Sequence, residues 1–234
     1  MEILAIIPAR GGSKGIPRKN LKQIAGYPLI YHTIEAAKNS KYVNRLILST
    51  EDDEISSVAF SYGVEVSKRP LELAQDETKT APVLLNVLEQ LEQKENYVPD
   101  VVVLLQATCP LRDSKRLDEA FELFFSSDCD SVFTVRPVGI THALWRQNHD
   151  GTVLGLYDYR NRPRRQDEDK HFGLYRETGE TYIIKTEVLK KVKDFVGEKP
   201  IFHIPNDENT IDIDTVEDFE VAEKILLSRK KIKE

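Results

Sequence analysis

Short apolar runs alternate with helical patterns through the first 135 residues, and this alternation restricts the fold more than any other feature. The apolar runs occupy 3–7, 45–50, 64–66, 100–106 and 131–135, and the helical patterns occupy 29–39, 54–63, 80–93 and 114–127. Continuous apolar strands that alternate with helices indicate βαβ units, in which helices cover both faces of a parallel sheet. We therefore predict an α/β fold with a mostly parallel sheet.

The pattern breaks between residues 137 and 179, where the chain is polar and rich in Arg, Asp and aromatic residues. Long structureless loops are uncommon in compact domains and are usually functional, so we expect this excursion to pack against a partner. Strand patterns resume at 181–185 and 201–205, with helices expected over about 186–196 and 216–232. We predict one domain over residues 1–234 that carries the excursion.

Composition excludes several classes of protein. The chain has 33 basic and 39 acidic residues, a net charge of −6, which argues against a dedicated duplex nucleic-acid binder. No apolar run approaches the roughly 18 residues that a membrane span requires. Cys109 and Cys129 form neither a disulfide framework nor a metal cluster. Together these features favour a cytoplasmic protein that binds neither membranes nor nucleic acid.

The loop after the first strand, IIPARGGSKGIPRKN (6–20), combines glycines with cations. It contains Gly11, Gly12 and Gly15 together with Arg10, Lys14, Arg18 and Lys19, and no acid occurs among residues 3–34. Glycines let backbone amides approach an anion, and the cations neutralise it. The spacing matches neither G-x-x-x-x-G-K-[ST] nor G-x-G-x-x-G, which disfavours a P-loop ATPase and a Rossmann dehydrogenase. A turn with solvated lysines is the alternative, and the concentration of cations favours polyphosphate binding.

An acidic pair, Asp212 and Asp214, stands in T-I-D-I-D-T just before the last helical pattern. Side chains at i and i+2 of an extended segment point to one face, and two carboxylates suit a Mg²⁺ ion shared with phosphates. Alternatively, Asp214 or Thr215 caps the helix. Spacing alone leaves both readings open. A second acidic cluster at 52–54 is expected to begin a helix.

These motifs resemble the signature of the acylneuraminate cytidylyltransferases, which include CMP-sialic acid synthetases and relatives that act on legionaminic and pseudaminic acids. The resemblance begins with ARGGSKGIPRKN and L-x-x-I-x-G-x-P-L-I and extends over nearly the whole chain. It continues through the segments 46–55, 62–78, 104–112, 165–166, 176–183 and 211–223. It implies a three-layer α/β/α nucleotidyltransferase fold, a requirement for CTP and Mg²⁺, and a homodimer, for which we expect 137–179 to form the interface.

The resemblance also implies roles for individual residues. CMP would pass from CTP to the anomeric hydroxyl of a nonulosonic acid, with release of pyrophosphate. The catalytic residues would be Arg10, Lys19, Asp212 and Asp214, and the last two would hold the metal. The nucleotide would contact Arg10, Gly11, Gly12, Ser13, Lys14, Lys19, Asn20, Thr78 and Thr80. The sugar acid would contact Gln106, Arg112, Arg165, Gln166 and Arg176.

The sequence departs from the family pattern on the sugar side. The usual P-T-S-P-L-R reads A-T-C-P-L-R, in which Cys109 is expected to be a buried small residue and not a nucleophile. The usual R-P-N-G reads R-E-T-G at 176–179. Two rival hypotheses remain: a nucleotidyltransferase of the same fold that uses another NTP or another sugar acid, and a nucleotide-binding protein without turnover.

Overall fold

The structure is a computed structural model that describes residues 1–138, 145–156, 158–161, 174–206 and 209–233. By their contacts these residues form two compact units, one of residues 1–134 with 178–234 and one of residues 135–177. The second unit falls on the segment that we predicted as a dimerisation excursion. Its role in dimerisation stays a prediction.

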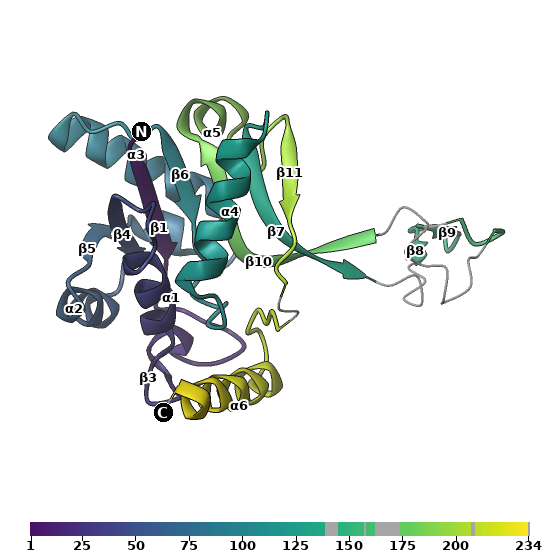
Figure 1. The fold of residues 1–234 in the computed structure, drawn as a ribbon, viewed down its shortest axis with the longest axis horizontal. Helices are drawn as coiled ribbons and strands as arrows, with labels where there is room; N and C mark the ends of the chain where they lie inside the picture. Colours follow the sequence, from purple (N-terminus) through teal and green to yellow (C-terminus); the bar gives the residue numbers. More distant parts are fainter. Residues whose placement is uncertain (139–144, 157, 162–173, 207–208, 234) are drawn as a thin grey trace. The chain divides into compact units, whose positions relative to one another are not determined.

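A seven-stranded sheet forms the centre of the first unit, in the order β11-β7-β10-β6-β1-β4-β5 (Figure 1). The strands are β1 (Ile3–Pro8), β4 (Arg45–Thr50), β5 (Glu65–Lys68), β6 (Val101–Leu104), β7 (Ser131–Val138), β10 (Leu174–Lys185) and β11 (Pro200–His203). β6, β1, β4 and β5 run parallel to one another, as β11 does to β7, whereas β10 runs antiparallel to β6. The prediction of a mostly parallel sheet is confirmed.

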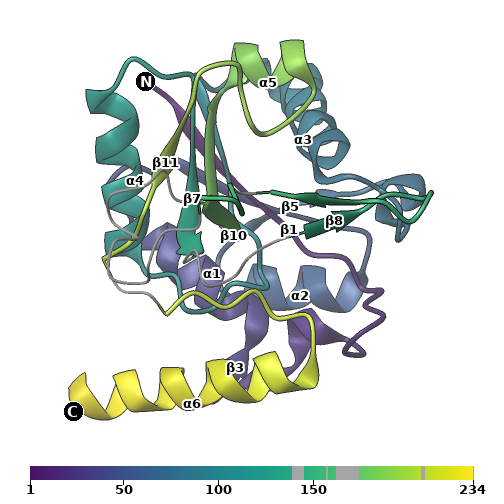
Figure 2. The same cartoon turned by 90° about the vertical axis from the view of Figure 1, so that its right-hand side faces the viewer.

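Helices cover both faces of this sheet. They are α1 (Leu29–Lys38), α2 (Asp53–Ser61), α3 (Thr80–Glu95), α4 (Ser114–Ser126), α5 (Thr186–Val192) and α6 (Val216–Lys233). Figure 2 shows α4 on one side of the strands and α3 with α5 on the other. α5 ends four residues earlier than we predicted, because Lys193 adopts a left-handed conformation (φ 56°) that interrupts the helix.

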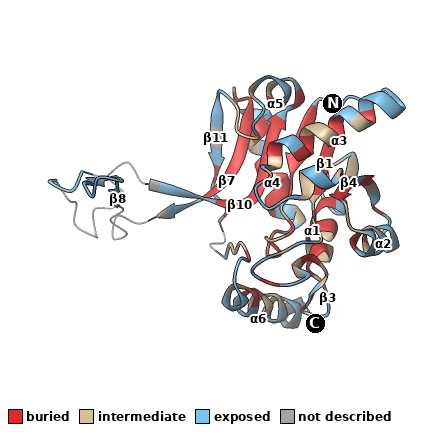
Figure 3. Ribbon diagram, turned by 180° about the vertical axis from the view of Figure 1, so that it is seen from behind, coloured by how far each residue is buried: buried red, intermediate tan, exposed pale blue. Residues whose placement is uncertain are grey.

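The apolar runs become strands that are buried on both faces. Ile3, Ala5 and Ile7 pack into one core cluster with residues of α1, α2 and α4, while Leu4 and Ile6 are fully buried on the opposite face. Figure 3 shows this burial along the central strands. A parallel strand that is covered on both sides needs apolar residues at every position, which explains why these runs do not alternate.

A smaller core joins the two ends of the chain. Ile16 from the loop after β1 packs with Ile213, Phe219 and Ala222, and also with Ile24 and Leu29. Ile24 belongs to a two-stranded ribbon, β2 (Gln23–Ile24) and β3 (Tyr27–Pro28). This core holds α6 and the segment before it against the glycine-rich loop, so residues near the two termini meet at the carboxyl edge of the sheet.

The second unit contains a short antiparallel hairpin of β8 (Trp145–Gln147) and β9 (Val153–Gly155). Asn148 and Thr152 close its turn through their backbones at 2.9 Å, and the rings of Trp145 and Tyr159 lie 4.9 Å apart. Among the helices that the structure describes, none combines the length and the apolar character that a membrane crossing requires.

Candidate functional site

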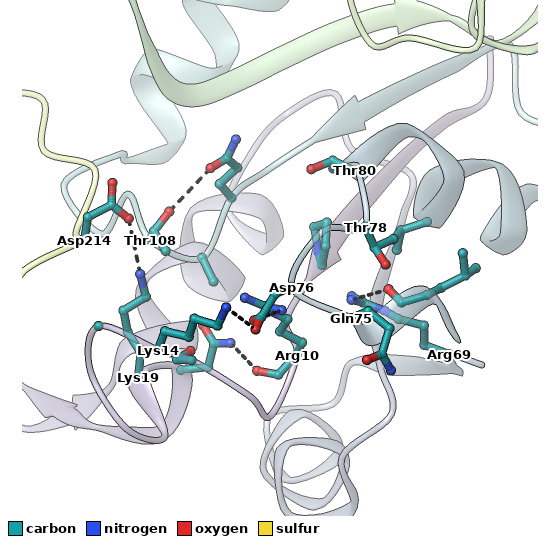
Figure 4. Close-up of a pocket in the computed structure, with 18 residues that line it drawn as sticks. Arg10, Lys14, Lys19, Arg69, Gln75, Asp76, Thr78, Thr80, Thr108 and Asp214 are labelled. Atoms are coloured by element: carbon teal, nitrogen blue, oxygen red, sulfur yellow. Dashed lines mark hydrogen bonds and ion pairs between the residues drawn. The ribbon is translucent and has the colours of Figure 1, made fainter. Parts of the chain in front are cut away.

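A cavity of about 400 Å³ opens where β1, β5 and β6 end, and Figure 4 shows its walls. Its lining comes from the loops that follow these strands, from the connection that leads into α3 and from the residue two positions before α6. Loops after the carboxyl ends of parallel strands are where open α/β sheets bind ligands. The main polar lining residues are Arg10, Ser13, Lys14, Lys19, Asn20, Arg69, Asp76, Thr78, Thr80, Gln106, Thr108 and Asp214.

Nine of the residues that we predicted for the site line this cavity. They are Arg10, Ser13, Lys14, Lys19, Asn20, Thr78, Thr80, Gln106 and Asp214. They come from segments that are widely separated in the sequence, and the fold brings them to one edge of the sheet. The cavity is therefore the place where the predicted nucleotide-binding residues meet.

Two cations of the glycine-rich loop share an acidic partner. Arg10 lies 2.7 Å from one carboxylate oxygen of Asp76, and Lys14 lies 2.7 Å from the other. The hydrogen bond from Lys14, with further support from Arg10, holds the pKa of Asp76 below its usual value. Asp76 lies in the connection before α3. Its carboxylate balances the positive charge of a loop that contains no acid of its own.

A third loop cation, Lys19, faces the acidic pair. It lies in a short 3₁₀ helix (Lys19–Leu21), donates a hydrogen bond to the carbonyl of Ile213 and lies 3.6 Å from Asp214 Oδ1. The neighbouring Asn20 is buried, and its side-chain amide donates to the carbonyl of Arg10 at 2.9 Å. In this structure Asn20 shapes the loop through the nitrogen that could otherwise reach a phosphate.

The fourth cation, Arg18, is directed away from the cavity. It adopts a left-handed conformation (φ 54°) and forms ion pairs with Asp52 and Glu54 at the start of α2. Asp52 also caps α2 by accepting a hydrogen bond from the amide of Ile55, which confirms that the 52–54 cluster begins a helix. The hydrogen bonds from Arg18 lower the pKa of Asp52 to about 2. Arg18 therefore fastens the loop to α2.

Gly11 and Gly12, which we predicted to contact the nucleotide, are not among the lining residues. The amide of Gly11 donates to Glu51 Oε1 at 2.7 Å, and a Cβ at this position would lie 2.4 Å from Asp52 Oδ2. A side chain at position 11 would therefore collide with Asp52, and glycine lets the backbone of the loop lie against that residue. Gly15 has a similar role, since its Cβ would lie 2.5 Å from the carbonyl oxygen of Asp214.

Thr215 and Asp218 cap the last helix, so the carboxylate of Asp214 is not needed for this purpose. Thr215 Oγ1 accepts a hydrogen bond from the amide of Asp218 at 3.1 Å, and Asp218 Oδ2 accepts from the amides of Thr215 and Asp214. This is the reciprocal pattern of a capping box. The hydrogen bonds from Thr215 lower the pKa of Asp218. The side chain of Asp214 remains 78% exposed beside Lys19.

Asp212 directly precedes the buried Ile213, and its side chain lies close to Gly179 of β10. A Cβ placed on Gly179, which has a φ of 73°, would lie 2.9 Å from Asp212 Oδ2 and 3.3 Å from Gln106 Oε1. Asp212 itself is not among the cavity-lining residues, whereas Gln106 and Asp214 are. The two carboxylates thus flank the end of the cavity that Lys19 and Gln106 define.

The donor set fits a hard cation that keeps most of its own ligands. Within the described part of the chain no three His, Cys, Asp or Glu side chains gather as a complete metal cage. Mg²⁺ does not need one, because it commonly binds through one or two carboxylates and fills the remaining positions with water and substrate phosphate. Asp212 and Asp214 offer that number of carboxylates beside a cavity lined by four cations, Arg10, Lys14, Lys19 and Arg69.

The predicted sugar-binding residues do not gather in one place. Gln106 lines the cavity, whereas Arg176 is exposed in the second unit. Arg165 and Gln166 lie outside the described residues. Arg112 is 3% exposed, and it donates to the carbonyls of Gln106 (2.8 Å) and Glu180 (3.1 Å) and to Thr33 Oγ1 (3.3 Å). These hydrogen bonds hold the loop that carries Gln106, and the contact of Arg112 with the sugar stays a prediction.

Cys109 is buried, as we predicted. Its thiol lies 3.5 Å from the carbonyl oxygen of Thr178, and burial raises its pKa well above the usual value. A thiol that resists ionisation is a poor nucleophile. Cys109 is therefore part of the packing between the loop after β6 and β10.

Sequence reasoning missed Arg69 and Asp76. Arg69 directly follows β5 and is buried against the cavity wall, where it donates to the carbonyl of Ser49 at 2.7 Å. Burial lowers its pKa from the usual value. Its position at the carboxyl end of a parallel strand was a usable signal. Asp76 had no comparable signal, because nothing in its local sequence pairs it with Arg10.

Comparison with known proteins agrees with this geometry. A family model described as cytidylyltransferase matches residues 4–232. The N-acylneuraminate cytidylyltransferase A of Danio rerio is 37% identical over 229 residues, which are 96% of this chain and 51% of that protein. The pseudaminic acid cytidylyltransferase of Campylobacter jejuni is 35% identical over 230 residues, 97% of this chain and 96% of that protein. The chain thus spans about half the length of the first relative and nearly all of the second.

Solved structures confirm the nucleotidyltransferase-type fold. A CMP:2-keto-3-deoxy-manno-octonic acid synthetase in complex with CTP superposes with a TM-score of 0.70 at 15% identity, covering 98% of this chain and 100% of that one. A 4-diphosphocytidyl-2C-methyl-D-erythritol synthase superposes with a TM-score of 0.69 at 14% identity, covering 96% and 99%. At these identities the likeness establishes the three-layer α/β/α architecture alone.

Proposed function

Because the chain belongs to the cytidylyltransferase family, we propose that it transfers CMP from CTP to the anomeric hydroxyl of a nonulosonic acid and releases pyrophosphate. The observation that carries this proposal is the cavity in which Arg10, Lys14 and Lys19 stand opposite Asp214. Relatives named for N-acylneuraminate and for pseudaminic acid support the sugar class.

The three loop cations would bind the triphosphate. A hydroxyl attacks the α-phosphate in line with the departing pyrophosphate, and such a transfer depends mainly on positioning and on stabilisation of charge. Lys19 is suited to the reacting phosphate because its side chain is only 13% exposed and is held beside the acidic pair. Arg10 and Lys14 are suited to the phosphates that leave, and they would exchange Asp76 for these oxygens.

The nucleoside would lie along the connection into α3. Thr78 and Thr80 line the cavity there, and Lys79, which precedes α3, has no side-chain capping hydrogen bond. Thr78 Oγ1 donates a hydrogen bond of 3.2 Å to the carbonyl of Glu72. We therefore prefer Thr80 as the residue that contacts the cytosine or the ribose. Arg69 contributes positive charge from the wall of the cavity.

Asp212 and Asp214 would hold Mg²⁺, in keeping with their carboxylate chemistry and their position at the cavity. When bound, the ion would supply Lewis-acid stabilisation of negative charge on the phosphates. The residues of the chain orient the reactants: Lys19 neutralises phosphate charge, and Gln106 presents a side-chain amide toward the sugar. Arg165, Gln166 and Arg176 stay as predicted contacts for the carboxylate of the sugar, which guanidinium groups recognise well.

The assembly is part of the proposal. We propose a cytoplasmic homodimer in which residues 137–179 form the interface, because this segment is a separate compact unit of the chain by its contacts. The two thiols at Cys109 and Cys129 are free and buried, which is compatible with a reducing compartment. Light scattering at micromolar concentration tests the dimer: a monomer would contradict it.

Pyrophosphate release with a panel of substrates tests the proposed reaction. The protein is incubated with each of CTP, UTP, ATP and GTP, and with N-acetylneuraminic, legionaminic, pseudaminic or deoxyoctulosonic acid. We expect release with CTP and one of the three nonulosonic acids. Release with another NTP, or with deoxyoctulosonic acid alone, would favour the first rival hypothesis. No release with any pair would favour a binding protein without turnover.

A further inference from the structure

Arg116 and Glu180 form a buried ion pair beneath the acidic segment. Arg116 lies in the first turn of α4, and its Nη1 is 3.2 Å from Glu180 Oε1 on β10. The two side chains are 7% and 3% exposed. Burying a charge pair costs solvation energy that its mutual attraction often fails to recover, so such a pair is weak evidence of a purely stabilising role.

The pair is also incompletely satisfied. Glu180 Oε2 is buried and makes no hydrogen bond to any group in the described part of the chain. A buried carboxylate with an unfilled acceptor carries an additional penalty. These residues are therefore better explained by what they hold in place than by a contribution to the stability of the fold.

Arg116 reaches the segment that carries the acidic pair. Its Nη1 also donates to the carbonyl of Asn209 at 3.2 Å, three residues before Asp212. On the far side of Asp212, the amide of Ile213 donates to the carbonyl of Thr108 at 2.9 Å. The backbone is thus tied on both sides of Asp212, once by Arg116 and once by the loop after β6.

Glu180 fixes the opposite wall. It follows Gly179, whose missing Cβ leaves the space that Asp212 Oδ2 approaches. The backbone carbonyl of Glu180 accepts from Arg112, and its amide donates to Thr178 Oγ1. Through one guanidinium group, α4 therefore connects the strand that faces Asp212 to the segment on which Asp212 stands.

We infer that Arg116, anchored by Glu180, is a positioning residue that holds Asp212 against Gly179 and thereby sets the affinity of the acidic pair for Mg²⁺. The inference rests on the proposed function for its metal, but its structural part concerns residues 209–214 and can be measured without turnover. Groups that orient metal ligands typically change metal affinity or activity about 10–100-fold when they are removed.

The double variant Arg116→Met/Glu180→Met separates positioning from folding. It replaces a buried ion pair by apolar side chains of similar size, a change that proteins often tolerate without loss of stability. The matched control is Arg45→Met/Glu65→Met, which removes an Arg–Glu pair between β4 and β5. We expect the double variant to keep a thermal midpoint close to that of the unmodified protein.

Two measurements decide the inference. Hydrogen exchange of the amides at 209–214 should become about tenfold faster in the double variant and remain unchanged in the control. Binding of Mn²⁺ in the presence of CTP, followed by electron paramagnetic resonance, should weaken about tenfold, with an equal rise in the Mg²⁺ concentration for half-maximal turnover and a KM for CTP within about twofold. Unchanged exchange, unchanged metal affinity or an equal effect in the control would overturn the inference.

Arg116→Lys provides a second variant for the same two measurements if the double variant does not fold. Both hydrogen bonds come from Nη1. The lysine keeps the charge opposite Glu180, but its shorter and more flexible side chain does not hold an ammonium at the position of Nη1, so both bonds are weakened. We expect the same changes at about half the size on a logarithmic scale, and no change would overturn the inference. If the unmodified protein releases no pyrophosphate with any substrate pair, the proposed function fails, and the exchange at 209–214 still decides whether Arg116 holds the segment.

Discussion

Lys19 Nζ lies 3.6 Å from Asp214 Oδ1, which joins the loop after the first strand to the segment before the last helix. The lysine side chain is 13% exposed, whereas that of the aspartate is 78% exposed. The cation is thus fixed by the fold, and it also donates to the carbonyl of Ile213. The carboxylate stays open to a ligand. This relationship places a cation and an exposed carboxylate side by side in the wall of the cavity.

Replacing Lys19 by Met should remove charge stabilisation from the reacting phosphate while the fold persists. We expect kcat/KM for CTP to fall about 10²–10³-fold, the usual effect of removing one preorganised group that stabilises developing charge. Steady-state pyrophosphate release measures it. Lys68→Met is the control, because Lys68 pairs with Asp53 at the surface. A loss below threefold for Lys19→Met would contradict this role.

Asp212→Asn should impair the metal-dependent step and spare the binding of CTP. The amide keeps the shape of the carboxylate but removes its charge, so we expect turnover to fall about a hundredfold with the affinity for CTP nearly unchanged. Turnover and equilibrium binding are measured on the same preparation. Asp128→Asn, at an exposed residue that pairs with Lys199, is the control. Turnover equal to that of the unmodified protein would refute Asp212 as a metal ligand.

Asp76→Asn should strengthen the binding of inorganic tripolyphosphate. Asp76 neutralises Arg10 and Lys14, so a polyphosphate that binds these cations must displace it. Exposed ion pairs are weak, and we expect the dissociation constant to fall only roughly two- to fivefold. Calorimetric titration measures this change, with Glu77→Gln as the neighbouring control. Weaker binding in Asp76→Asn would show instead that Asp76 organises the loop for its ligand.

His203 should make stability depend on pH between about 4 and 6.5. It is 7% exposed, and burial, with a contribution from Arg116, lowers its pKa from 6.5 to about 4. Between these values the unfolded chain binds a proton that the folded chain does not, so stability is greatest above pH 6.5. It falls as the pH decreases toward 4, by up to about 1.4 kcal/mol per pH unit.

Thermal unfolding of His203→Gln measures this contribution. The midpoint of the unmodified protein should fall more steeply between pH 7 and pH 5 than that of the variant. The exposed His149 supplies the control, and His149→Gln should follow the unmodified protein. Parallel curves for His203→Gln and the unmodified protein would show that His203 does not resist protonation.

The sheet was predictable because a strand that is buried on both faces needs an apolar residue at every position. Ile3 to Ile7 are apolar at every position, and each such run forms a strand between helices. Strand direction was less accessible: β10 is antiparallel to β6, and no feature of residues 181–185 distinguishes it from a parallel strand. The end of α5 depends on the left-handed backbone conformation of Lys193, and a lysine in the sequence does not predict that conformation.

The site was predictable where a ligand demands particular residue types, and less so where the partners come from elsewhere in the chain. Arg18 and Lys19 are adjacent and alike in charge, yet Arg18 pairs with Asp52 and Glu54 while Lys19 lines the cavity. Arg112 matches a family motif, yet its guanidinium donates to two backbone carbonyls and to the hydroxyl of Thr33. Such assignments depend on tertiary contacts that sequence spacing does not encode.

The identity of the reaction product distinguishes transfer of CMP to a sugar acid from simple hydrolysis of CTP. The protein is incubated with CTP, Mg²⁺ and each nonulosonic acid, and the mixture is followed by phosphorus nuclear magnetic resonance and mass spectrometry. We expect a phosphodiester resonance and the mass of a CMP-linked sugar acid, together with one equivalent of pyrophosphate, and about a hundredfold slower formation of both products with Asp212→Asn. Hydrolysis of CTP without a CMP-sugar, or no consumption of CTP with any of these acids, would contradict the proposed reaction.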